Sequence, residues 1–217
     1  AFAFIVRKNT FEPYTLQRHE VNEYPLSREE AIQKVAASLS AKDVIVSTTG
    51  MISRELFEYR TAQGQGHERD FLTVGSMGHA SQIALGIALE KTDRRVWCFD
   101  GDGAALMHLG SVAIIADKAP ENFVHVIFNN GAHDSVGGQP TVGLKVNLAG
   151  IAKAAGYKDA VSVTTADDLG SALKALKTMR GPVLLEVRVH RGNRKDLGRP
   201  TTTPIQNRDA LMEFMGQ

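Results

Sequence analysis

Three short polar segments each follow an apolar run, and their side chains are of the types that bind a metal ion and a phosphate group. They are residues 101–103 (Gly-Asp-Gly), 129–130 (Asn-Asn) and 47–50 (Ser-Thr-Thr-Gly). Carboxylate and amide oxygens are the ligands that Mg²⁺ prefers, and glycines beside the acid allow the backbone to approach closely. Hydroxyls and a glycine just before a helix suit an anion, because backbone amides favour negative charge there.

The spacing of these segments predicts that they lie together. Residues 104–128 separate Gly103 from Asn129, which is enough chain for one helix and one strand. In a parallel sheet this step brings both loops to the same edge, where such sheets bind their ligands. We therefore expect Asp102 and Asn130 to converge on one metal ion. Taken singly, each segment also fits a plain turn in which a threonine or an aspartate caps the next helix.

Short apolar runs alternate with helical patterns along the chain. The alternation indicates parallel strands buried on both faces, and it predicts an α/β fold: a doubly wound, mostly parallel sheet with helices on both faces. The first helical pattern opens with a capping box, Ser27-x-x-Glu30. The expected strands are 44–46, 96–99, 123–128, 161–163 and 183–189, with one more after the glycine-rich loop 63–67. The expected helices are 31–39, 52–59, 77–89, 104–116, 147–155, 167–179 and 208–215.

The N-terminal segment differs from the rest of the chain. Residues 1–6 (AFAFIV) predict a buried strand that starts without a preceding turn, while residues 7–26 are polar, contain two prolines and have the character of a linker. We interpret residues 1–26 as the end of a missing upstream domain plus a linker. Removal of the initiator methionine is the alternative explanation of the abrupt start. Residues 27–217 form a single domain in this interpretation.

The composition excludes several classes of protein. Because 43% of the residues are hydrophobic, a sizeable core is available and disorder is excluded. The net charge of +1 argues against a nucleic-acid binder, which needs a basic excess. The single cysteine, Cys98, cannot make a disulfide framework or a cysteine-based zinc site by itself. No apolar run reaches the length of a membrane span and no signal-peptide layout is present, so we expect a cytoplasmic protein without a membrane contact.

The pairing of Gly101-Asp102-Gly103 with Asn129-Asn130 resembles the signature of thiamine diphosphate-dependent enzymes. The upstream segment 73–80 (TVGSMGHA) resembles the same family and stands at the expected distance before the Gly-Asp-Gly. The resemblance implies a thiamine diphosphate-binding fold that holds the cofactor together with Mg²⁺. It covers only the diphosphate-binding half of such an enzyme.

The resemblance also implies which residues bind the metal ion and the diphosphate. Mg²⁺ would be bound by the side chains of Asp102 and Asn130 and by the backbone carbonyl of Ala132. Asp134, beside this loop, would have to point away from the diphosphate or pair with a cation. The residues implied at the diphosphate are Thr48, Thr49, Gly50, Gly103, Ala104, His133, Asp134 and Ser135.

Three residues of the upstream segment are implied at the organic part of the cofactor. Met77 would be the apolar wedge that bends the cofactor into its reactive V shape, with Gly78 beside it. The carbonyl of Gly75 would accept a hydrogen bond from the exocyclic amine of the pyrimidine. Without the resemblance, Met77 would be read as an ordinary core methionine at a helix start.

The family also uses a glutamate that protonates the aminopyrimidine, and no glutamate of this chain can be assigned that role. In the family this glutamate belongs to a separate pyrimidine-binding domain, usually from a partner subunit. The resemblance therefore implies that no catalytic residue is assignable on this chain. It further implies a pyrimidine-binding domain in the same or a partner chain, and a homo-oligomer.

Over essentially its whole length the chain resembles the phosphonopyruvate decarboxylases. The similar stretches are 48–56, 75–80, 129–141 and 194–201. The resemblance implies a carbon–carbon lyase of phosphonate metabolism that decarboxylates 3-phosphonopyruvate, a small anionic 2-oxo acid, to phosphonoacetaldehyde and CO₂. The residues considered for substrate binding are His133, Arg194, Lys195 and Arg199, because arginine suits phosphonate oxygens. A basic tail that meets only water is the alternative.

Other functions stay open at this point. The sister family of sulfopyruvate decarboxylases shares the middle motifs, and the chain could be a subunit of such an enzyme or of another 2-oxo acid decarboxylase or synthase. A non-catalytic module that stores or senses thiamine diphosphate is a further alternative. A dinucleotide-binding domain is disfavoured because no G-x-G-x-x-G follows any expected strand, and Leu106 stands where the third glycine would be.

Overall fold

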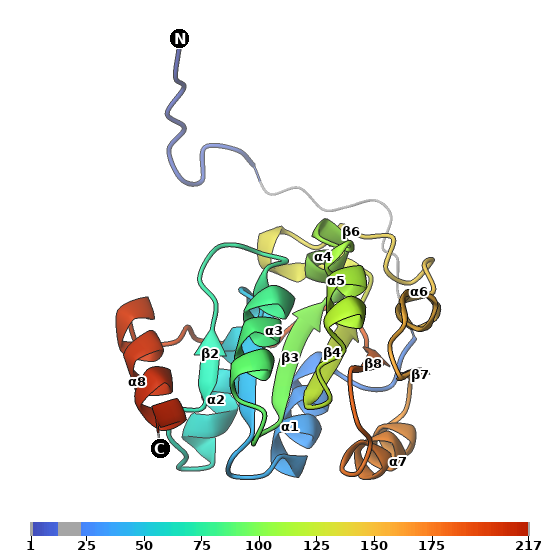
Figure 1. Ribbon diagram of the computed structural model, residues 1–217. Coiled ribbons are helices and arrows are strands. Elements are labelled where there is room, and N and C mark those ends of the chain that lie inside the picture. The colour runs from blue at the N-terminus through green and yellow to red at the C-terminus, as the bar shows by residue number, and fades with distance from the viewer. Residues whose placement is uncertain (1, 13–22, 217) are drawn as a thin grey trace.

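The computed structural model describes residues 2–12 and 23–216 of the chain, and it is built around one six-stranded sheet (Figure 1). Every neighbouring pair in this sheet is parallel, and the strand order is β2-β1-β3-β4-β8-β7. The strands are β1 (Val44–Ser47), β2 (Asp70–Leu72), β3 (Val96–Gly101), β4 (Phe123–Asn129), β7 (Asp159–Val163) and β8 (Val183–Arg188). A separate antiparallel pair joins β5 (Ala132–His133) to β6 (Gln139–Pro140).

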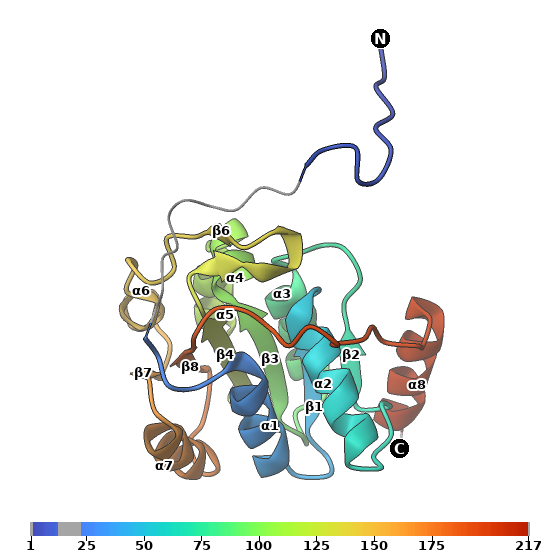
Figure 2. The same ribbon diagram turned by 180° about the vertical axis from the view of Figure 1, so that it is seen from behind.

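Helices cover both faces of the sheet, as the alternating pattern predicts. On one face lie α1 (Arg28–Ser38), α2 (Met51–Ala62) and α7 (Ala166–Leu176), which share a core with the sheet and stand in front in Figure 2. On the other lie α3 (Ala80–Glu90), α5 (Ser111–Lys118) and α6 (Leu148–Ala155), in front in Figure 1. The short α4 (Asp102–Met107) follows β3, and α8 (Pro204–Gly216) packs beside β2. All residues of β4 are buried, as expected for a strand with helices on both sides.

The α/β fold class is confirmed, and most expected elements form within a few residues of their predicted bounds. The capping box is present: the Ser27 side chain accepts from the Glu30 amide, and the Glu30 carboxylate accepts from the Ser27 amide. The expected helix 208–215 begins earlier, at Pro204, because proline is well tolerated in the first turn of a helix. Within the described residues, no helix has both the length and the apolarity to cross a bilayer.

Two predicted helices were wrong in detail. The helix expected over 77–89 starts only at Ala80, because Ser76 and Gly78 have positive φ angles of 48° and 88° that no α-helix contains. The helix expected over 104–116 is two helices separated by residues 108–110. Gly110 caps the second of them, and glycine is a poor residue for a helix interior.

The predicted buried strand at the N-terminus is not formed among the residues that the structure describes. Residues 2–6 are in no strand, and the side chains of Phe2, Phe4 and Ile5 are more than nine-tenths exposed. An apolar run becomes a buried strand only where a sheet edge and a covering layer meet it, and neither does so here. Residue 1 and residues 13–22 of the expected linker lie outside the described residues. Leu26, in contrast, is buried in the core, and its carbonyl accepts from His190 N at 3.0 Å.

The order of the strands fixes where a ligand can bind. From β1 the chain moves outward to β2, and it then returns to place β3 on the other side of β1. The loops that follow β1 and β3 therefore leave in opposite directions and open a crevice between them. In doubly wound sheets ligands bind at this switch point, outside the carboxyl ends of the strands.

Candidate functional site

The three polar segments singled out in the sequence meet at one cleft above the carboxyl ends of β1, β3 and β4. The cleft has a volume of about 50 Å³. The expected site residues that line it are Thr48, Thr49, Met77, Asp102, Gly103, Ala104, Asn130, Ala132, His133, Asp134 and Ser135. Gly50, Gly75 and Gly78 do not line it, but Gly50 is the N-cap of α2 beside Thr49. The three polar segments therefore lie together at one edge of the sheet, as the topology predicts.

Asp102 and Asn130 lie in direct contact. Asp102 is the first residue of α4 and is 1% exposed, and its carboxylate accepts from the backbone N–H of Asn130 and from the Thr141 hydroxyl. Burial raises the pKa of Asp102 above its usual value, although these hydrogen bonds and the nearby His133 oppose the shift. The fold thus keeps a carboxylate where its negative charge is poorly solvated, which favours occupation by a cation.

The two asparagines at the end of β4 have different roles. Asn129 is fully buried and satisfied within the protein: its amide donates to Gly143 O at 2.9 Å and to Glu186 Oε1 at 2.6 Å. Asn130 faces the cleft, where its Nδ2 donates to Asp134 Oδ2 at 2.7 Å and its Oδ1 accepts from Ala132 N at 3.0 Å. Asn130 thus brings an amide group to the wall of the cleft.

Two glycines allow loops to close tightly over the cleft. A Cβ at Gly143 would lie 2.4 Å from Asp102 Oδ2, so only glycine lets the loop after β6 cover this carboxylate. A Cβ at Gly103 would lie 2.2 Å from His133 Cε1. The imidazole of His133 therefore lies directly against the backbone of the Gly-Asp-Gly turn. Glycine is needed at position 103 because any side chain there would overlap the imidazole, in addition to its role in the turn.

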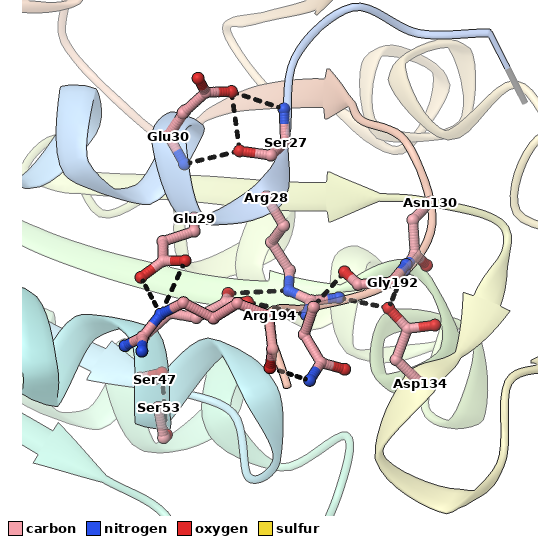
Figure 3. Close-up of polar contacts among 12 residues, drawn as sticks. Ser27, Arg28, Glu29, Glu30, Ser47, Ser53, Asn130, Asp134, Gly192 and Arg194 are labelled. Carbon is pink, nitrogen blue, oxygen red and sulfur yellow. Dashed lines mark hydrogen bonds and ion pairs between the residues drawn. The ribbon is translucent and has the colours of Figure 1, made fainter. Parts of the chain in front are cut away.

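A buried arginine that sequence reasoning missed connects the cleft to the core. Arg28 is 4% exposed and donates to Asp134 Oδ2 at 2.7 Å (Figure 3). It also donates to both carboxylate oxygens of Glu55, each at 2.8 Å. Asp134 Oδ2 also accepts from Asn130 and from Gly192 N, so one carboxylate oxygen gathers donors from three segments. The expectation that Asp134 pairs with a cation is met by Arg28.

The charge state of Arg28 follows from its partners. Burial by itself would lower the pKa of Arg28, but the hydrogen bonds and charges of Glu55 and Asp134 outweigh burial and raise it. The guanidinium is therefore a permanent cation at the floor of the cleft, which it also lines. One feature of the sequence could have pointed to Arg28. It is a basic residue at the start of a helix, where the helix dipole favours acidic residues, so a nearby negative partner is expected.

The hydroxyl of Thr48 is an unsatisfied group in the cleft. Thr48 is 3% exposed, and its Oγ1 is buried without a hydrogen-bond partner among the described residues. A buried hydroxyl without a partner is costly and points to a ligand atom that completes it. The neighbouring Ser53 is satisfied in contrast, since its hydroxyl donates to Thr48 O at 2.6 Å.

The segment after β2 presents Met77 to the cleft from the other side. Gly75, Ser76 and Gly78 all have positive φ angles, so the backbone turns sharply around this methionine. A Cβ at Gly78 would lie 2.8 Å from Ala104 O, which shows how closely this turn packs against the start of α4. Met77 is therefore held by its backbone at the mouth of the cleft, and it is not a core methionine at a helix start.

The cations of the basic tail lie in three different environments. Arg194 forms ion pairs with Glu29 of α1 (Figure 3) and with Glu58 of α2, which hold the tail against these helices, and it also pairs with Asp196 within the tail. Lys195 is exposed. Neither lines the cleft, whereas Arg199 lines a second cavity that adjoins it. Of the residues considered for the substrate, only His133 and Arg199 are placed near the cleft.

Comparisons with known proteins agree with this geometry. Residues 48–187 match the family described as thiamine pyrophosphate enzyme, C-terminal TPP binding domain. The phosphonopyruvate decarboxylase of Streptomyces viridochromogenes is 40% identical over 180 residues, which make up 83% of this chain and 44% of that protein. The sulfopyruvate decarboxylase subunit beta of Methanocaldococcus jannaschii is 42% identical over 134 residues, or 61% of this chain and 68% of that subunit.

A solved structure supports the same fold. The crystal structure of benzoylformate decarboxylase from Polynucleobacter necessarius matches with a TM-score of 0.67 at 17% identity, over 86% of this chain and 37% of that one. This chain thus spans less than half the length of the phosphonopyruvate decarboxylases that it matches. Because the family match covers residues 48–187, more than half of the chain, and includes every residue that lines the cleft except Arg28, the chain belongs to the thiamine pyrophosphate enzyme family, as a C-terminal TPP-binding domain.

Proposed function

We propose that this chain supplies the diphosphate- and Mg²⁺-binding half of an enzyme that decarboxylates 3-phosphonopyruvate to phosphonoacetaldehyde and CO₂. The observation that carries the proposal is the convergence of Asp102, Asn130 and the unsatisfied Thr48 hydroxyl at one cleft. The choice of substrate is supported by the 40% identity to two Streptomyces phosphonopyruvate decarboxylases.

The residues of the cleft fit a magnesium ion. Asp102 offers a poorly solvated carboxylate, Asn130 offers an amide oxygen at the cleft, and Ala132 offers a backbone carbonyl from the adjoining strand β5. These hard oxygen ligands are the set that Mg²⁺ takes, with phosphate oxygens and water completing an octahedron. We assign the metal site to these three residues.

The same cleft fits a diphosphate. The Thr48 hydroxyl and the backbone amides of Gly103 and Ala104 are donors for phosphate oxygens, with Thr49 and Gly50 beside them. Segment 133–135 encloses the group from the opposite side, and there Arg28 neutralises the carboxylate of Asp134. Without that pairing, a carboxylate at this position would repel the diphosphate across the cleft.

When bound, thiamine diphosphate supplies the electron sink that stabilises the charge left on the substrate as CO₂ departs. The chain's own contribution is binding and positioning. Met77 would pack against the organic part of the cofactor at the mouth of the cleft, and Gly75 would offer its carbonyl to the pyrimidine amine. Asp102 and Asn130 fix the metal, and through it they fix the position of the diphosphate.

The activating glutamate must come from a pyrimidine-binding domain of the same or a partner chain. Two observations support this part of the proposal. The relatives named phosphonopyruvate decarboxylase are more than twice as long as the matched region, and residues 2–6 expose apolar side chains that a neighbouring domain would bury. We propose that residues 1–26 connect to that domain and that the active enzyme is an oligomer.

A sulfopyruvate decarboxylase subunit is the second candidate. One observation favours it: this chain covers 84% and 88% of the length of two sulfopyruvate decarboxylase subunits named beta, at 35% and 32% identity. The metal and diphosphate assignments are the same for both candidates. They differ only in the tetrahedral anion that the substrate carries on C3.

CO₂ release by the assembled enzyme tests the proposal. The enzyme, with its pyrimidine-binding domain, is assayed with thiamine diphosphate, Mg²⁺ and a panel of phosphonopyruvate, sulfopyruvate and pyruvate. We expect kcat/KM for phosphonopyruvate to exceed the others by about 100-fold or more. Preference for sulfopyruvate would transfer the function to the second candidate, and no turnover of any member would refute a decarboxylase of this class.

Thr48 provides a test of the diphosphate assignment that does not depend on activity. Thr48→Val keeps the shape of the side chain and removes a hydroxyl that has no partner, so we expect the unfolding temperature without cofactor to be unchanged or higher. Affinity for thiamine diphosphate should fall by about tenfold, since one hydrogen bond to a charged group is lost. Calorimetric titration measures this change.

Thr73→Val is the matched control for that experiment. The Thr73 hydroxyl donates to Ser47 O at 2.9 Å, so its loss leaves a buried carbonyl with one partner fewer. We expect this variant to lose about 1 kcal/mol of folding free energy. If Thr48→Val destabilises the cofactor-free protein as much as Thr73→Val does, the Thr48 hydroxyl is structural and its assignment is wrong.

A further inference from the structure

A second cavity adjoins the cofactor cleft on the side of α2 and the C-terminal tail. It has a volume of about 400 Å³ and shares Thr49, Met77 and Ser135 with the cleft, so the two spaces meet at these residues. Its outer wall is the segment that follows β8, which passes α1 and α2 on its way to α8 (Figure 2). The cavity is large enough for a small organic acid and reaches Met77, the residue that we propose packs against the organic part of the cofactor.

Two arginines line this cavity and no acidic residue does. Arg54 is on the first turn of α2 and is partly buried, while Arg199 comes from the tail. Among the described residues, neither guanidinium has a hydrogen bond or an ion pair. Other arginines of the chain differ: Arg28, Arg60 and Arg194 are each held by carboxylates. The cavity therefore concentrates two uncompensated positive charges beside the expected reaction centre.

The rest of the lining suits a tetrahedral oxyanion. Thr202 borders the cavity, and no hydrogen bond of its hydroxyl to another described residue is found, whereas the hydroxyls of Ser53, Thr73 and Thr203 already donate within the protein. Guanidinium groups donate in pairs to phosphonate or sulfonate oxygens, and the Thr202 hydroxyl could add one more donor. Arg54 also lies at the positive end of the α2 dipole, where a cation is disfavoured unless an anion compensates it.

We propose that Arg54 and Arg199 together bind the anionic group on C3 of the substrate, and that this pair selects phosphono- or sulfopyruvate over pyruvate. The proposal rests on the proposed function and adds a specificity site to it. Pyruvate carries a methyl group at C3, so it would leave both guanidinium groups without their partner and would gain nothing from the cavity. A site built for a polar group rejects an analogue that lacks the group much more strongly than an apolar pocket rejects a misfit.

The test compares Arg54→Met and Arg199→Met with Arg180→Met in the assembled enzyme. Arg180 is an exposed arginine that precedes β8, at the opposite end of the sheet. We expect each cavity variant to lower kcat/KM for phosphonopyruvate at least about 100-fold, to leave kcat/KM for pyruvate unchanged or higher, and to leave thiamine diphosphate affinity within about threefold. Arg54→Lys should recover only part of the loss, because lysine cannot donate in pairs.

A binding measurement separates failure of this site from failure of the proposed function. Methylphosphonate carries the tetrahedral anion without the 2-oxo acid, and its binding to the cofactor-loaded enzyme is followed by calorimetry. Suppose that phosphonopyruvate is not a substrate, but that methylphosphonate binds and Arg54→Met abolishes its binding. The anion site is then supported, and the proposed reaction is refuted. If Arg54→Met retains wild-type selectivity in an active enzyme, or methylphosphonate does not bind to an inactive one, the anion site is refuted.

Discussion

Replacing Asp102 by alanine is expected to lower CO₂ release by the assembled enzyme about a thousandfold or more. Asp102 would bind the metal ion that positions the whole cofactor. Losing this ligand should therefore lower the rate at least as much as deleting one hydrogen-bond donor to a charge that develops in the transition state. Affinity for thiamine diphosphate in the presence of Mg²⁺ should fall in parallel. Asp117→Ala removes a mostly exposed carboxylate of α5 and should leave both quantities unchanged.

The same position gives an opposite prediction for stability. Burial raises the pKa of Asp102, so near neutral pH the folded protein without metal holds a charge that it solvates worse than the unfolded chain does. Asp102→Asn removes this charge and keeps the shape of the side chain. We therefore expect the unfolding temperature without cofactor and metal to rise or stay the same while activity is lost, as at other sites where function costs stability. Lower stability together with retained activity would contradict a metal-ligand role.

Replacing Arg28 by methionine is expected to cost about 3–5 kcal/mol of folding free energy, because it leaves Glu55 buried without its partner. Glu55 is 1% exposed, and Arg28 provides two of its hydrogen bonds at 2.8 Å. Chemical unfolding of the variant measures the loss. The double variant Arg28→Met/Glu55→Leu should recover part of it, since the uncompensated carboxylate is then gone as well.

Arg28 also connects stability to function. Without it, Asp134 keeps its donors from Asn130 and Gly192 but loses its cation, and an uncompensated negative charge then faces the diphosphate. We expect cofactor affinity to fall about 10–100-fold, in the range found when groups that orient metal ligands are removed. Arg180→Ala, which breaks the exposed pair with Glu121, should cost at most about 1 kcal/mol and leave affinity unchanged. Equal losses for the two arginines would show that the buried network has no special role.

The central part of the site was predictable from the sequence because it depends on rules of topology. Parallel strands joined by helices place their carboxyl ends at one edge, so Asp102 and Asn130 had to meet once the strands before them were identified. The apolar runs identify those strands, since strands covered on both faces carry few polar residues. The capping box at Ser27 is equally local, and it is present as expected.

The parts that were missed depend on contacts between distant segments. Arg28 precedes Asp134 by more than a hundred residues, and no pattern along the chain shows that α1 brings it under the loop after β4. The grouping of Arg54 with Arg199 has the same origin, since the tail after β8 had no predicted path. Residues 2–6 form no strand in the structure, because an apolar run does not by itself supply the sheet that a strand needs.

Titration of thiamine diphosphate into the assembled enzyme, with Mg²⁺ and again after chelation of divalent ions, tests the central claim most directly. The claim is that this chain holds the cofactor's diphosphate through a metal bound by Asp102 and Asn130. We predict one binding site for each copy of this chain, with affinity lost on chelation and lost equally in Asp102→Ala. Binding of the same strength with and without divalent ions, unaffected by Asp102→Ala, would contradict the account.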